Sequence, residues 1–191
     1  LIGSALLFYA GWELIIVGLL CVLFAFLYTT GPYPLSYNGW GDVLVIVFFG
    51  FVPVGGTYYV QALTWTSDTT VASLICGLLI DTLLVVNNYR DREADARSGK
   101  RTVIVRFGEK FGRYLYLMLG VAASLLCFWF FFEGHLFAAL LPLLYLIPHV
   151  LTWRRMVQIH SGKKLNSILG ETSRNMLLMG ILLSIGFLIR H

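Results

Sequence analysis

Six apolar runs dominate this sequence, and each is close to the length that a helix needs to cross the hydrocarbon core of a bilayer. Of all residues, 58% are hydrophobic and only 13% are charged. Such a chain excludes a water-soluble globular domain and predicts an all-α fold, a polytopic bundle of six transmembrane helices. The predicted spans are residues 13–28, 43–60, 71–88, 114–132, 136–152 and 176–189.

An apolar stub, residues 1–10, precedes the first run. It has no initiating Met, no basic region and no small-residue cleavage site, so it does not resemble a signal peptide. We expect it to be the end of an earlier helix. Residues 1–191 are therefore interpreted as a single transmembrane domain that is incomplete at its N-terminus.

The basic residues test this helix count. If the helices alternate in direction, the loops at 29–42, 89–113 and 153–175 lie on one side of the membrane, and those at 61–70 and 133–135 lie on the other. Only Arg190 falls on the second side, and the positive-inside rule makes the first side cytoplasmic. Because the cations flank helices and no soluble domain presents them, a nucleic-acid partner is not expected. The 13 basic residues of the first side are Arg90, Arg92, Arg97, Lys100, Arg101, Arg106, Lys110, Arg113, Arg154, Arg155, Lys163, Lys164 and Arg174.

The segment VVNNYRDREADARSGKRT, residues 85–102, concentrates charge at the cytoplasmic end of the third run. Asn87, Asp91 and Asp95 are spaced four apart, so a continuing helix would present all three on one face, each about 6 Å further along the axis. Asn88 and Glu93 would point elsewhere.

Two carboxylates one turn apart, with an amide oxygen one turn deeper, suit Mg²⁺, which proteins commonly hold with one or two carboxylates and substrate phosphates. Arg97, Lys100 and Arg101 could pair with the remaining phosphate oxygens, and Gly99 would let the loop turn back over the helix end. The alternative is a solvated helix end with ion pairs one turn apart and arginines that set topology. The residues themselves leave both interpretations open.

The motif as a whole resembles a known family. The run NNYRDREAD, with GKRT at 99–102 and VRFG at 105–108, closely resembles the second Asp-rich motif of the UbiA superfamily of intramembrane prenyltransferases. YTTGPYPLSYNGWGD at 28–42, FFG at 48–50 and GTYYVQ at 56–61 are also similar to that family, in particular to its branch that prenylates 1,4-dihydroxy-2-naphthoate in menaquinone synthesis. The resemblance covers essentially the whole chain, as the later two thirds of a nine-helix fold.

This resemblance implies Mg²⁺-dependent transfer of a polyprenyl group from polyprenyl diphosphate to 1,4-dihydroxy-2-naphthoate, with loss of CO₂, in a bacterial inner membrane. Asp91 and Asp95 would be the catalytic metal ligands. The implied substrate-binding residues are Asn87, Asn88, Lys100, Arg101 and Tyr28.

Two departures from the family pattern matter. The first Asp-rich motif, of the N-x-x-x-D type, has no counterpart in residues 1–191. The 4-hydroxybenzoate branch has Y-x-x-x-K after its fourth helix, whereas Tyr28 is followed by TTGP with no Lys, which disfavours that acceptor. Prenylation of 4-hydroxybenzoate or homogentisate remains the alternative, and prenyl chain length and oligomeric state stay open.

Several other polar residues have two interpretations. Asp81 lies inside the third apolar run, where an ionisable group indicates either a functional pocket or a paired polar group. Tyr28, Tyr37 and Asp42 could cap the cavity and position the acceptor, or pack at the interface. Pro32 and Pro34 argue against a helix through that loop.

The remaining reactive side chains suggest no separate chemistry. No Ser/His/Asp or Cys/His arrangement is evident, and the three cysteines have no metal-ligand or paired spacing, so they are interpreted as small apolar residues. The four histidines are scattered and are expected to be structural or interfacial. These residues are Cys21, Cys76, Cys127, His135, His149, His160 and His191.

Two rival functions were weighed. A CDP-alcohol phosphatidyltransferase also uses Mg²⁺ and aspartates at a helix end, but Asp91 and Asp95 lack the D-G and A-R pairs of that family. A membrane transporter with Asp81 as coupling residue would predict internal repeats, and it leaves the clustered aspartates and GKRT unexplained.

Overall fold

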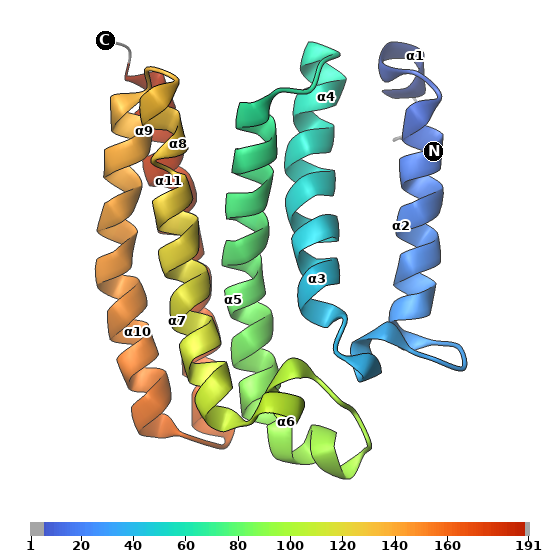
Figure 1. The fold of residues 1–191 in the computed structure, drawn as a ribbon, viewed down its shortest axis with the longest axis vertical. Helices are drawn as coiled ribbons and strands as arrows, with labels where there is room; N and C mark the ends of the chain where they lie inside the picture. Colours follow the sequence, from blue (N-terminus) through green and yellow to red (C-terminus); the bar gives the residue numbers. More distant parts are fainter. Residues whose placement is uncertain (1–5, 190–191) are drawn as a thin grey trace.

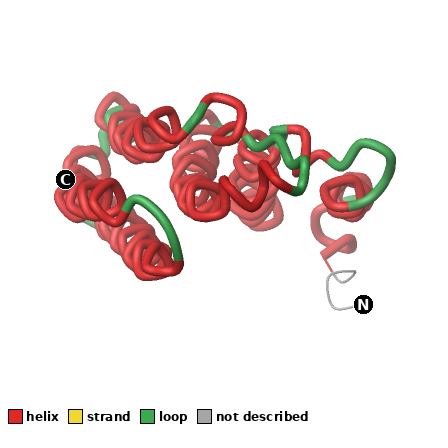
Figure 2. Tube along the Cα trace, turned by 90° about the horizontal axis from the view of Figure 1, so that it is seen from below, coloured by secondary structure: helices red, strands yellow, loops and turns green. Residues whose placement is uncertain are grey.

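The computed structural model describes residues 6–189, and every regular element within them is a helix, as predicted. The long helices run in alternating directions, with α2 at one end of the molecule and α10 and α11 at the other (Figure 1), and Figure 2 shows the same row from below. The elements are α1 (Leu7–Ala10), α2 (Glu13–Thr29), the 3₁₀ turn η2 (Leu35–Asn38), α3 (Gly41–Val45), the π-helix η3 (Ile46–Gly55), α4 (Gly56–Ala62), α5 (Ser67–Arg97), α6 (Val103–Phe107), α7 (Glu109–Leu126), α8 (Trp129–Phe132), α9 (Leu136–Leu140), η4 (Leu141–Tyr145), α10 (Leu146–Ile159), η5 (Lys163–Leu165) and α11 (Asn166–Leu188).

All six predicted apolar helices are present. The first of them, α2, is apolar but has only 17 residues, fewer than the other five. The prediction that residues 1–10 end an earlier helix falls partly outside the described residues, and α1 forms one short turn there. Five helical stretches are long and apolar enough to cross a membrane: Gly41–Ala62, Ser67–Arg97, Glu109–Phe132, Leu136–Ile159 and Lys163–Leu188.

The predicted ends of several helices were wrong in one direction. The span predicted at 71–88 is helical over Ser67–Arg97, and the last helix begins ten residues before the predicted residue 176, at Asn166. Hydropathy identifies only the part of a helix that lies in hydrocarbon, whereas the backbone stays helical where polar side chains reach water or other polar groups. Asp91 and Asp95 therefore lie on helix rather than on loop.

The alternation predicted for the loops is confirmed. The segments 30–40, 98–108 and 160–165 gather at one end of the bundle, which is the lower end in Figure 1. The connections 63–66 and 133–135 lie at the opposite end. Arg190 lies outside the described residues.

A close contact between η3 and α5 sets the position of α5 in the bundle. A Cβ atom added to Gly50 would lie 2.5 Å from the carbonyl oxygen of Ser73, and one added to Gly77 would lie 2.9 Å from the Cα of Ile46. Small residues of this kind let transmembrane helices approach closely. Pro53 lies within η3, where it leaves one main-chain hydrogen bond unmade.

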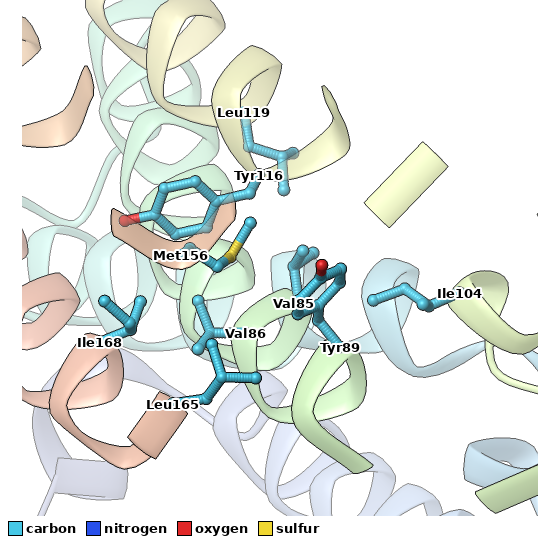
Figure 3. Packing of buried hydrophobic residues seen from close by; sticks show 9 residues of the cluster. All are labelled: Val85, Val86, Tyr89, Ile104, Tyr116, Leu119, Met156, Leu165 and Ile168. Carbon is cyan, nitrogen blue, oxygen red and sulfur yellow. The ribbon is translucent and has the colours of Figure 1, made fainter. Parts of the chain in front are cut away.

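The charged end of α5 rests on a buried apolar cluster that joins it to five neighbouring segments (Figure 3). Side chains of α6, α7, α10, η5 and the start of α11 pack against one side of α5, leaving its other side for polar chemistry. The cluster consists of Val85, Val86, Tyr89, Ile104, Tyr116, Leu119, Met156, Leu165 and Ile168.

Candidate active site

The helix that the aspartate spacing requires is continuous. Residues 67–97 form one α-helix, so Asn87, Asp91 and Asp95 lie on one face at successive turns, as predicted. The Asp91 side chain is 38% exposed and that of Asp95 is 13% exposed. The Asp91 carboxylate therefore remains accessible, while that of Asp95 is largely covered.

Arg90 donates hydrogen bonds to the side-chain oxygen atoms of Asn87 and Asp91. Its Nε donates to Asp91 Oδ1 at 2.8 Å, and its Nη2 donates to Asp91 Oδ2 at 2.6 Å and to Asn87 Oδ1 at 2.7 Å. Its Nη1 donates to Oδ1 of Asn166 on α11 at 2.9 Å. The sequence had suggested only a topological role for Arg90, and it gave no signal for Asn166, which is 76 residues away.

The loop after α5 folds back over the helix end, as Gly99 predicted. Gly99 has φ +77°, and the next main-chain N–H, that of Lys100, donates to the carbonyl oxygen of Asp95 at 2.9 Å. The Lys100 Nζ lies 3.4 Å from Asp95 Oδ2, an oxygen that is buried and has no hydrogen-bond partner in the described structure. Lys100 therefore lies beside Asp95, and its contact with phosphate stays a prediction.

Arg101 is positioned by its backbone rather than by its side chain. Its N–H donates to the carbonyl oxygen of Tyr37 at 2.7 Å, and Arg106 Nη2 donates to the carbonyl oxygen of Asn38 at 2.7 Å. These bonds attach the loop at 30–40 to the GKRT segment. The Arg101 side chain is exposed, so its proposed contact with phosphate remains a prediction.

Asn88 precedes Asp95 by seven residues, so these two lie on the same side of α5, and the expectation that Asn88 points elsewhere was wrong. Asn88 meets Tyr28 of α2 at a small cavity that also reaches Lys100. Asp42 lines the cavity, whereas Tyr37 does not. The lining residues are Tyr28, Ser36, Gly39, Gly41, Asp42, Asn88, Lys100 and Thr102.

Tyr28 also lines a larger apolar pocket of about 540 Å³ between α2, α3, η3 and α5. Leu84 forms the α5 wall of this pocket, one turn deeper than Asn88. An aromatic ring could therefore lie with its polar substituents toward Asn88 and its body among apolar side chains, as ligand pockets generally allow.

A second apolar cavity lies along α5, deeper in the membrane than Asn87. It has a volume of about 750 Å³ and runs between α5 and α11, and we refer to it as the α5–α11 groove. Ile80 lines it and is seven residues before Asn87, which places the two on the same face of α5. The lining residues are Val54, Ala72, Ile75, Cys76, Leu79, Ile80, Ser173, Met176, Leu177, Met179, Gly180, Ile181, Leu183, Ser184 and Ile185.

Asp81 is the least explained polar residue. It is 1% exposed, and both its Oδ1 and that of Asp42 are buried without a hydrogen-bond partner in the described part of the chain. The two carboxyls and Tyr28 lie close enough to interact electrostatically. The structure thus shows no paired partner for Asp81 Oδ1 within residues 6–189, and the predicted pocket role stays a prediction.

A charged network on the opposite side of α5 was not predicted. Glu109, at the start of α7, forms ion pairs with Arg92 at 3.2 Å, with Arg113, and with His160 Nδ1 at 2.9 Å, and its Oε1 accepts from the Tyr89 hydroxyl at 3.1 Å. The network ties α5, α7 and the end of α10 together. In the sequence, the only indication of this network was a single glutamate, Glu109, at a helix start with several basic residues nearby.

The histidines and cysteines agree with structural roles. His149 is buried, stacks on Tyr116 and lies within hydrogen-bond distance of the Tyr145 hydroxyl, and His135 packs edge-on against Phe187. His191 lies outside the described residues. All three cysteines are free, and Cys127 is fully buried.

The metal predicted at Asp91 and Asp95 can be tested against the donor atoms. Within residues 6–189, no three His, Cys, Asp or Glu side chains are grouped closely enough to hold a metal ion. The two carboxylates and the Asn87 amide are nevertheless hard oxygen donors on one face, and Asp95 Oδ2 lacks a hydrogen bond. They fit part of a Mg²⁺ site that substrate phosphates would complete.

Comparison with known proteins identifies the class. Residues 1–186 match the family model described as the UbiA prenyltransferase family, so the chain belongs to that family. The resemblance stated from the motifs is confirmed.

Particular relatives narrow the comparison. The chain is 38% identical over 181 residues to a 1,4-dihydroxy-2-naphthoate octaprenyltransferase of Haemophilus influenzae, covering 91% of this chain and 56% of that protein. It is 40% identical over 113 residues to the protein of the same name from Escherichia coli, covering 59% of this chain and 36% of that protein. It is 30% identical over 162 residues to UbiA prenyltransferase domain-containing protein 1 of Dictyostelium discoideum, covering 85% and 48%.

The chain spans between about a third and somewhat more than half of the length of these three relatives. No solved structure matches it.

Proposed function

We propose that the protein containing this chain transfers a polyprenyl group from a polyprenyl diphosphate to 1,4-dihydroxy-2-naphthoate, with Mg²⁺ and with loss of CO₂. The observation that carries the proposal is the polar face of Asn87, Asp91 and Asp95 at one end of α5, together with the apolar α5–α11 groove deeper along the same helix. A substrate with a charged diphosphate and a long apolar tail matches both features. Residues 1–191 would form one transmembrane prenyltransferase domain together with the remaining part of the protein.

The diphosphate would bind at the charged end of α5. Asp91 and Asp95, with the Asn87 amide oxygen, would hold Mg²⁺ together with ligands from the diphosphate. When bound, the metal supplies Lewis-acid stabilisation of the leaving diphosphate. Lys100, 3.4 Å from Asp95, would offset the remaining phosphate charge, and Arg101 would add to the positive field of the same loop.

The tail would lie in the α5–α11 groove. Along α11 the groove extends from Ser173 to Ile185, which is about 18 Å of helix. Its walls are apolar apart from two serines, so they would orient the prenyl chain without competing for the diphosphate.

The acceptor would approach α5 at Asn88, beside Asp95. Asn88 and Tyr28, at the cavity that also reaches Lys100, would bind polar substituents of the aromatic ring. The allylic carbon–oxygen bond of the donor would break, an aromatic carbon would form the new bond, and the carboxyl group of the naphthoate would leave as CO₂. This division places donor and acceptor on adjacent faces of one helix, with Lys100 between them.

The orientation follows from charge. The charged end of α5 and the loops beside it, which carry nearly all of the basic residues, lie at one end of the bundle. By the positive-inside rule we expect that end to be cytoplasmic. We infer that the site faces the cytoplasm from a bacterial inner membrane.

The test compares two carboxylates that lie two residues apart on α5. The full-length natural protein, expressed in membranes, is given Mg²⁺, 1,4-dihydroxy-2-naphthoate and a radiolabelled polyprenyl diphosphate. Asp91→Asn should lower product formation at least a hundredfold, whereas Glu93→Gln, an exposed residue on a different face, should leave it nearly unchanged.

Equal activity of the two variants would refute the role of Asp91. Turnover of 4-hydroxybenzoate or homogentisate in place of the naphthoate would keep the reaction type and change the acceptor. No prenylated product from the parent with any of the three acceptors would refute the proposal.

A further inference from the structure

Arg90 connects two helices across the end of the α5–α11 groove. On α5 it binds Asn87 and Asp91, and on α11 it binds Asn166 at 2.9 Å. The groove begins deeper in the membrane, at Ile80 on α5 and Ser173 on α11. These residues are about 15 Å and 10 Å of helix below the two ends of the bridge. The bridge therefore lies between the groove and the aqueous side.

The same side chain occupies the oxygen atoms that a metal would need. Both carboxylate oxygens of Asp91 and the amide oxygen of Asn87 accept hydrogen bonds of 2.6–2.8 Å from Arg90. A carboxylate at the membrane surface is stabilised by such a charge-assisted pair. A divalent cation that bound Asp91 and Asn87 through these atoms would be repelled by the guanidinium, so its binding would favour movement of Arg90.

The displaced guanidinium would have an obvious partner. Its planar set of N–H donors matches the spacing of phosphate oxygens, and it remains charged at every physiological pH. Arg90 is already beside Asp91, so a diphosphate held by a metal on Asp91 would lie within its reach. Lys100, the other cation near the aspartates, is 3.4 Å from Asp95 and therefore lies beside Asp95 rather than Asp91.

We propose that Arg90 is a diphosphate-binding residue that holds the metal ligands while the site is empty and moves to the phosphate oxygens when a prenyl diphosphate and a divalent cation bind. The movement frees three oxygen atoms on Asn87 and Asp91 and breaks the bridge to Asn166. This inference rests on the proposed function, because it assigns a residue to the donor subsite of that reaction.

The experiment uses the full-length natural protein in lipid nanodiscs and measures binding rather than turnover. One probe is Mn²⁺ alone, followed by electron paramagnetic resonance. The other is a non-reactive prenyl thiolodiphosphate with Mg²⁺, followed by equilibrium binding. The variants are Arg90→Gln, Arg90→Lys and Asn166→Ala, and Arg154→Gln on α10 is the control for loss of one exposed arginine.

The two probes should respond in opposite directions. Arg90→Gln should bind the thiolodiphosphate at least tenfold more weakly and bind Mn²⁺ alone as tightly as the parent or more tightly, because no guanidinium competes for Asp91. Arg90→Lys should restore only part of the diphosphate affinity, since a single ammonium cannot reproduce the planar set of donors. Asn166→Ala should bind the thiolodiphosphate at least as well as the parent, because only the bridge is lost.

Three results would overturn the inference. Thiolodiphosphate binding by Arg90→Gln equal to that of Arg154→Gln would remove Arg90 from the donor subsite. Equal weakening of both probes would show that Arg90 only supports the local structure. A parent protein that binds no thiolodiphosphate would refute the proposed function itself, and the inference with it.

Discussion

The contact between η3 and α5 gives a quantitative prediction for Gly50→Ala. The new Cβ would lie 2.5 Å from the Ser73 carbonyl oxygen and 2.8 Å from the Gly77 Cα, and both neighbours are backbone atoms that cannot rotate away. The helices would have to separate by about 0.9 Å to restore an ordinary 3.4 Å contact. Overpacking of this kind costs about 1–3 kcal/mol.

The control is Gly56→Ala on the adjoining α4, where an added Cβ meets no atom within 4 Å. There the better helix propensity of alanine should stabilise the protein by up to about 1 kcal/mol. The two substitutions are chemically identical, so the difference between them isolates the close contact. We expect that difference to be about 2 kcal/mol or more, with Gly50→Ala the less stable.

The assay is thermal unfolding of the purified full-length protein in detergent, followed by helical circular dichroism. A difference of about 2 kcal/mol corresponds to roughly 4–8 °C in Tm for a domain of this size. The double variant Gly50→Ala/Gly77→Ala should lose less than the sum of the single losses, because the first methyl group opens the gap that the second would need. Equal Tm values for Gly50→Ala and Gly56→Ala would refute the argument.

Three further predictions concern the site and its support. Lys100→Gln should raise the KM for prenyl diphosphate about tenfold, while Lys100→Arg should stay near the parent, and equal KM values for all three would contradict the assigned role of Lys100. Glu109→Gln should lower Tm, because Arg92 and Arg113 lose their shared carboxylate. The loss should be only a few degrees, because the network is partly exposed. An unchanged Tm would show that the network adds no stability. Gly180→Trp should shorten the prenyl chain that is accepted, because Gly180 lines the groove and an added Cβ there meets open space, whereas identical product lengths would place the tail elsewhere.

Local sequence periodicity was sufficient to predict the aspartate face. Four-residue spacing depends only on helix geometry, so Asn87, Asp91 and Asp95 could be placed on one side of α5 before any packing was known. Gly99 likewise predicted the turn that brings Lys100 to Asp95, because a positive φ is a local requirement. Features of this kind need only a few consecutive residues.

The tertiary partners could not be predicted in the same way. The bond from Arg90 to Asn166 joins residues 76 positions apart, and nothing near Asn166 in the sequence indicates which helix it faces. The meeting of Asn88 with Tyr28 at one cavity joins residues 60 positions apart, and it depends on how α2 and α3 pack beside α5. Hydropathy also placed the start of α11 too late, because its first turns carry polar residues.

The lengths of the connecting segments have a consequence for biogenesis. At the end of the bundle opposite the candidate site, the connections 63–66 and 133–135 contain four and three residues, and Glu133 is the only Asp, Glu, Lys or Arg among them. Moving a charge through hydrocarbon is costly, whereas moving a few neutral turn residues is not. Each pair of helices joined by such a turn can therefore enter the membrane as a hairpin during synthesis. The cations and carboxylates of the donor subsite would then stay on the ribosome side and never cross the lipid.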